Sequence, residues 1–174
     1  MRILGDAALL RLTTAAPAAS VVFAPWTTVH KAVTETVTSD STLTNDAELG
    51  ITLAASTKYA IRVVLFYNTA NATMDFKFGT AYTGTALGTP QTMFRGLISG
   101  AATAAGAEVA GQAAGQVSSQ AVTGTTSGVG HITLEQVIET NTGGQWSILW
   151  AQNTLDAGAL SVMFGSYLEY RVIA

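Results

Sequence analysis

Hydrophobic and polar residues alternate with a period of two along most of the chain. In residues 28–38, valine recurs at every fourth position, while threonine and alanine fill most of the positions of opposite parity. The same alternation returns in several later segments: 49–53, 74–78, 132–138, 146–150 and 160–172. Successive side chains of a β-strand point to opposite faces, so this pattern predicts strands with one buried face.

One segment, residues 59–67, is apolar on both faces except at Arg62. A β-branched and aromatic run of this kind is typical of a central strand. We expect residues 74–78 to pair with it as a hairpin, after a turn at 68–71. The glycines of residues 141–144 predict a second hairpin turn, between the strands at 132–139 and 146–150.

The chain carries about eight such segments and no convincing helical period. With 174 residues it fits one domain with a substantial core. Strands separated by glycine-rich turns favour an all-β fold, an antiparallel β-sandwich or jelly roll. No repeat of fixed period is visible, which disfavours propellers and solenoids.

Two parts of the chain depart from the strand pattern. Residues 1–25 contain Pro17 and Pro25, and proline cannot donate to a strand ladder, so we expect an N-terminal arm or edge strand there and the sandwich domain in 26–174. Residues 99–130 consist almost wholly of small side chains interrupted by glycine. We expect a long Gly/Ala-rich loop, which either reaches a neighbouring subunit or stays a flexible surface loop.

Charge is scarce in this chain. Asp, Glu, Lys and Arg make up 11% of the residues, against about 25% in an ordinary soluble domain. A neutral polar surface suits a subunit packed against neighbours, because burying an unpaired charge is costly. A secreted domain of low charge is the alternative.

The same composition excludes several classes of function. The net charge is −3 and only eight Lys and Arg are present, so we expect no nucleic acid as a direct partner. The absence of cysteine excludes disulfides, thiolate zinc sites and thiol catalysis. Asp6 and Arg11 interrupt the apolar start of the chain, and no window reaches about 18 apolar residues, so we expect neither an export signal nor a membrane segment.

Few residues suggest chemistry. His30 and His131 are the two histidines, and neither has a partner at metal-pair spacing or a nucleophile motif beside it. We expect no catalytic residue, no cofactor and no metal ligand. Residues 40–48 are rich in oxygen donors that calcium could use, but a turn capped by Asp and Asn side chains explains the same residues, and we favour that turn.

Aromatic residues are the best candidates for contacts with a partner. Trp146 and Trp150 share a strand face with Ile148, which predicts a place in the core. Trp26 follows Pro25 at the base of the N-terminal arm, close to Phe23. We therefore expect Trp26, Pro25 and Phe23 to contact a partner, with Trp26 as an exposed anchor.

Two stretches resemble a family of small virion proteins of tailed phages. The first is residues 36–49 running into 59–67 and 75–78, and the second is 149–154 followed by 165–171. The resemblance implies a β-sandwich structural component of the virion, on the head surface or in the tail. Members of that family often carry a Gly-Pro-type loop where this chain has Thr80, Ala81, Tyr82, Thr83 and Gly84, so contacts made by that loop do not carry over.

Composition and resemblance together predict a capsid decoration or cement protein. We expect a homotrimer that binds the major capsid protein or other virion proteins, in a virion assembled in the host cytoplasm. The first alternative is a tail or fibre-tip protein that contacts a host glycan through exposed aromatic residues. The second is a glycan-processing jelly-roll enzyme, which would need a cleft with two facing carboxylates. Of these we favour the decoration protein, and we expect no enzymatic activity.

Overall fold

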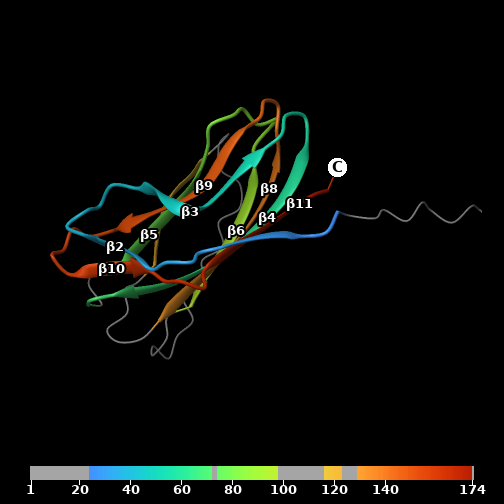
Figure 1. Ribbon diagram of the computed structural model, residues 1–174. Coiled ribbons are helices and arrows are strands. Elements are labelled where there is room, and N and C mark those ends of the chain that lie inside the picture. Colours follow the sequence, from blue (N-terminus) through green and yellow to red (C-terminus); the bar gives the residue numbers. More distant parts are fainter. Residues whose placement is uncertain (1–23, 72–73, 98–115, 123–128, 174) are drawn as a thin grey trace, which may run out of the picture.

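A computed structural model describes residues 24–71, 74–97, 116–122 and 129–173, and the regular elements in them are all β-strands. The fold is all-β and antiparallel, as predicted, with two sheets packed as a sandwich (Figure 1). The described residues form eleven strands: β1 (Thr27–His30), β2 (Glu35–Thr38), β3 (Thr44–Leu53), β4 (Lys58–Thr69), β5 (Phe76–Tyr82), β6 (Gln91–Leu97), β7 (Gln116–Val122), β8 (Gly130–Glu139), β9 (Gly144–Gln152), β10 (Ala159–Val162) and β11 (Tyr167–Val172).

The larger sheet is built around β4, the strand predicted to be central. Strand β8 pairs along one edge of β4, and β6 pairs with β8. Along the other edge, β11 pairs with the first half of β4 and β10 with the end of it. Strands β1 and β2 lie outside β11 and β10, respectively. The larger sheet therefore consists of β6, of the two continuous strands β8 and β4, and of two interrupted rows. One interrupted row is β11 and β10, and the other is β1 and β2.

The break corrects the prediction of one continuous strand over residues 28–38. The chain leaves the ladder between β1 and β2, opposite the kink that separates β10 from β11. At the kink Gly165 adopts a positive φ of 85°, which glycine tolerates. The Lys31 amide donates to the Ser166 carbonyl at 2.8 Å and the Gly165 amide donates to the Lys31 carbonyl at 3.0 Å. The two irregular segments thus satisfy each other's backbone groups.

The smaller sheet has the order β3, β9, β5, β7. Strand β7 lies within the segment 99–130 that was predicted as a loop, and it pairs with β5. The prediction of a loop is wrong for these residues. The hydrogen bonds between strands are made by backbone groups, so a segment of small side chains can still pair as a strand. The predicted arm, residues 1–25, lies outside the described residues except for Ala24 and Pro25.

Both predicted hairpins are also wrong. Strands β4 and β5 lie in different sheets, and so do β8 and β9, so each turn carries the chain across the sandwich. The reason is that the apolar faces on the two sides of each turn meet across the core. The rings of Tyr67 and Phe76 stack with centroids 4.6 Å apart, and Trp146 Nε1 donates to Gln136 Oε1 at 2.6 Å.

The core lies between the two sheets. It contains Trp146 and Trp150, each 1% exposed, which confirms their predicted place. Burial, assisted by the charge of Asp75, raises the pKa of Tyr67 to about 12. Within the part of the chain that the structure describes, no helix is long and apolar enough to cross a membrane.

Candidate functional site

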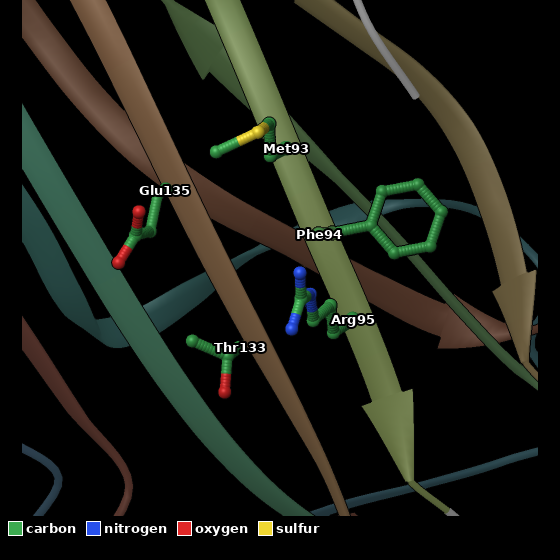
Figure 2. A pocket seen from close by; sticks show the side chains of 5 residues that line it. All are labelled: Met93, Phe94, Arg95, Thr133 and Glu135. Carbon is green, nitrogen blue, oxygen red and sulfur yellow. The ribbon is translucent and has the colours of Figure 1, made fainter. Parts of the chain in front are cut away.

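The face of the larger sheet that points away from the core carries two adjoining hollows of about 420 and 390 Å³. They share Met93 and Glu135, and we call them together the outer groove. Figure 2 shows the first hollow, with Met93 and Arg95 on β6 and with Thr133 and Glu135 on β8. The second extends across β4 and β11 to Trp26.

Strand register explains how these side chains come together. Met93 lies opposite Glu135, Glu135 opposite Arg62, and Arg62 opposite Glu169. The four residues thus form one row across β6, β8, β4 and β11. Side chains that lie directly opposite in an antiparallel pair are within contact distance. Residues from four strands therefore form one continuous surface.

Charges in the groove are arranged in pairs. Arg62 Nε lies 3.0 Å from Glu135 Oε1, and its Nη1 lies 3.8 Å from Glu169 Oε2. At the end of the same face Lys58 lies 3.3 Å from Glu139. Partly exposed pairs of this kind stabilise a fold by at most about 1 kcal/mol each. They neutralise the face, however, so that it attracts neither polyanions nor polycations strongly.

Apolar side chains are exposed between these pairs. Met93 is 53% exposed and Val137 is 38% exposed, on adjacent strands β6 and β8. Phe94 points the opposite way (Figure 2), into the core, where its ring packs edge-on against Phe78 with centroids 5.0 Å apart. The sandwich therefore holds the exposed residues of β6 on a firmly packed strand.

Trp26 lies at the rim of the outer groove. The guanidinium carbons of Arg62 and Arg171 lie 5.1 and 4.6 Å from its ring centroid, which is cation–π geometry. Trp26 is half-buried, so it is not the exposed anchor that was predicted, because the two arginines cover part of the ring. Pro25 beside it is exposed, and Phe23 lies outside the described residues.

A second site lies at the break between β1 and β2, where Lys31 meets three carboxylates. We call Lys31, Glu35, Asp46 and Glu48 the Lys31 cluster. Lys31 Nζ lies 2.8 Å from Asp46 Oδ2, 2.9 Å from Glu35 Oε2 and 3.6 Å from Glu48 Oε2. Burial lowers the pKa of Lys31, but the hydrogen bonds and charges of Asp46 and Glu35 outweigh it and raise this pKa above its ordinary value.

Asp46 is held from the smaller sheet as well. Its Oδ1 accepts hydrogen bonds from the backbone N–H groups of Glu48 at 3.0 Å and Leu49 at 2.9 Å, and its Oδ2 accepts one from Trp150 Nε1 at 3.0 Å. The ladder between β3 and β9 shifts register here, between Asn45 and Gly50. The shift turns Asp46 into the core.

The Lys31 cluster was not predicted from the sequence. A signal was present, because Lys31 shares its predicted strand face with valines. A charged residue on an apolar face needs a partner, and the partner Asp46 lies 15 positions away in the oxygen-rich run 40–48. No local pattern joins the two.

The two histidines and Asp40, the remaining candidates, contact other residues of the fold. His30 lies against Tyr167 and His131 against Phe66, with ring centroids 6.3 and 6.5 Å apart. Asp40 Oδ1 accepts a hydrogen bond from Thr42 N at 2.8 Å, so the expected side-chain-capped turn is present at the start of the run 40–48. For the rest of the run the prediction is wrong, because residues from Thr44 onward belong to β3. Among the described residues, no group of three or more histidine or acidic side chains could hold a metal ion.

Comparisons with known proteins assign no family. No family model matches the chain, and no curated protein matches it. A chain in the structure of infectious bursal disease virus Gx strain aligns with a TM-score of 0.22 and 14% identity, over 85% of this chain and 40% of that chain. This chain thus spans less than half of the viral chain, and a superposition at this TM-score supports no conclusion about fold or function.

Proposed function

We propose that the protein is a structural protein of a virion, a capsid decoration or cement protein that binds the head surface as an oligomer. The all-β sandwich and the low charge content support a packed subunit. The choice of particle comes from the resemblance to virion proteins of tailed phages, which lies in residues 36–49, 59–67, 75–78, 149–154 and 165–171. A trimer is the oligomer we expect.

The observation that carries the proposal is the outer groove. Met93 and Val137 are exposed together on a sheet face whose neighbouring charges, Arg62 and Glu135 among them, already pair with each other. An apolar surface surrounded by polar groups is typical of a protein–protein contact. Because the pairs are satisfied within the chain, a docking protein needs no opposite charge of its own.

The alternatives find less support. A glycan-binding protein would stack sugars on an open aromatic face, whereas the guanidinium groups of Arg62 and Arg171 lie over the Trp26 ring. For a glycan-processing enzyme, Glu35 and Glu48 share a hollow. Glu35 holds Lys31, however, and Glu48 accepts the backbone N–H groups of Ala32 and Val33 at 3.1 and 3.2 Å. Both carboxylates thus have their oxygens on groups of this chain.

Rebinding to particles tests the proposal. The test uses virus particles from the genome that encodes this chain, after the protein has been removed from them. Purified protein is added back, the particles are pelleted, and the copies of the protein bound per particle are counted. We expect saturable binding at many copies per particle, weakened at least tenfold by Met93→Asp or Val137→Asp, because either places a charge on the apolar contact.

The matched control is Leu155→Asp, which adds the same charge at a residue that is 63% exposed outside the groove. This variant should bind like the wild type. Binding should also fall little as salt rises, because the contact is largely uncharged. Absence of binding, or equal loss in the control, would contradict the proposal.

A further inference from the structure

The Lys31 cluster holds an amine and a carboxyl group in contact inside the protein. Lys31 Nζ lies 2.8 Å from Oδ2 and 3.0 Å from Oδ1 of Asp46, and the two side chains are 1% and 0% exposed. Both oxygens are bonded to Cγ, so the carbon that Nζ must attack is the next atom beyond them. We propose that Lys31 and Asp46 condense into an intramolecular isopeptide bond, an amide between Nζ and Cγ, with release of water.

The surroundings of Asp46 fit this reaction. Addition of Nζ to Cγ places negative charge on the carboxyl oxygens, and fixed donors aimed at such charge are the main source of stabilisation in acyl transfer. The backbone N–H groups of Glu48 and Leu49 both donate to Oδ1. We therefore assign Oδ1 as the oxygen that remains in the amide. Oδ2, which accepts from Trp150 Nε1, is the oxygen that leaves.

Glu35 is positioned to move the protons. Its Oε2 lies 2.9 Å from Lys31 Nζ, within reach for direct proton transfer. Glu35 takes one proton from the ammonium and delivers it to Oδ2 of Asp46, which converts the carboxylate into a carboxylic acid that an amine can attack. The lone pair freed on Nζ then forms the N–C bond. The Cγ–Oδ2 bond then breaks, and its electron pair stays on oxygen.

The reaction balances without a further reagent. Of the three protons of the Lys31 ammonium, two reach Oδ2, carried by Glu35, and form water. The third stays on the amide nitrogen. One positive and one negative charge disappear together, so the net charge of the chain is unchanged.

Burial favours the product. Two buried charges are expensive to keep in a protein interior, and condensation removes both. A hollow of about 360 Å³, lined by Lys31, Glu35 and Glu48 among others, adjoins the cluster and provides an exit for the water. The product amide itself lies where Lys31 and Asp46 are shielded from solvent, which protects it from hydrolysis.

The bond would cross-link the two sheets. Lys31 belongs to the break between β1 and β2 on the larger sheet, and Asp46 lies on β3 of the smaller one. The proposal does not depend on the proposed function, since it follows from the cluster alone.

Intact-mass spectrometry of the purified full chain tests the bond. We expect the wild type to be lighter than its sequence by one water molecule, and proteolysis to release a branched peptide that joins Lys31 and Asp46. Lys31→Arg keeps the positive charge but removes the amine, so it should keep the full sequence mass. Asp46→Asn should lose one ammonia molecule in place of water.

Glu35→Gln tests the proton carrier and should slow the reaction at least about 100-fold, the usual contribution of a positioned acid–base group. Lys58→Arg is the matched control, because Lys58 also pairs with a carboxylate but at the surface, and it should show the wild-type mass loss. A folded wild-type chain that keeps its full mass after prolonged incubation overturns the proposal. A loss of one water molecule that persists in Lys31→Arg also overturns the proposal. If a variant does not fold, the mass of the wild-type chain alone decides whether the bond forms.

Discussion

Gln136 offers a sharp test of how the two sheets are joined. The side chain belongs to β8 and is 4% exposed. Its Oε1 accepts from Trp146 Nε1 at 2.6 Å and its Nε2 donates to Thr92 Oγ1 at 2.8 Å. Gln136→Leu keeps a similar volume but removes both bonds and leaves the indole N–H, on a residue that is 1% exposed, without this acceptor.

The expected loss of stability follows from these contacts. A buried polar group left unsatisfied costs about 1–3 kcal/mol, and each lost hydrogen bond contributes about 1 kcal/mol, so we expect Gln136→Leu to lower the free energy of unfolding by about 2–4 kcal/mol. Urea unfolding followed by tryptophan fluorescence measures this change. The m-value should equal that of the wild type, which shows that the variant changes the stability and not the compactness of the folded or unfolded state.

Two further variants isolate the cause. Gln145→Leu is the matched control, because Gln145 is exposed on β9 and its Oε1 accepts only a surface hydrogen bond from Thr52 at 3.3 Å. It should change the stability by less than about 0.5 kcal/mol. In a Trp146→Phe background, Gln136→Leu should cost clearly less than in the wild type, since no indole N–H remains. A loss below about 0.5 kcal/mol for Gln136→Leu in the wild type would show that these two hydrogen bonds do not hold the sheets together.

Two other predictions concern alkaline pH and glycine. The pKa of Tyr67 is about 12 in the folded chain and about 10 when unfolded, so its stabilisation is complete below pH 10 and is lost as pH rises to 12, by up to about 2.7 kcal/mol; Tyr67→Phe should flatten that part of a urea-unfolding series against pH. Gly144→Ala would place Cβ 2.3 Å from the backbone nitrogen of Gly84, whereas in Gly50→Ala the nearest atom, at 2.7 Å, is the end of the flexible Gln145 side chain. Thermal unfolding should therefore show a loss of about 1–3 kcal/mol or more for the first variant and a clearly smaller one for the second.

The sequence allowed prediction of strands and of the faces they bury. Residues 59–67 lie in the central strand, and Trp146 and Trp150 lie in the core, because a period of two reports the direction of each side chain. Strand partners were not predictable in the same way. The pattern is identical whether two apolar faces lie side by side in one sheet or meet across the core, which is why both expected hairpins proved to be connections between sheets.

The candidate sites show the same limit. The outer groove depends on the order β6, β8, β4, β11, and no two of these four strands follow one another directly along the chain. Trp26 could be proposed from its place beside Pro25, but the two arginines that cover it come from β4 and β11. The Lys31 cluster depends on the break between β1 and β2 and on the register shift of β3. The alternation of apolar and polar residues predicts neither of these irregularities.

A cryo-electron microscopy map of the particle would show directly whether this protein lies on the head. The proposal predicts density for this two-sheet sandwich at repeated positions over the head, with the β6 and β8 side of the larger sheet, where Met93 and Val137 lie, against a neighbouring subunit. A map in which the head lacks the sandwich, or in which that side faces solvent at every copy, would contradict it.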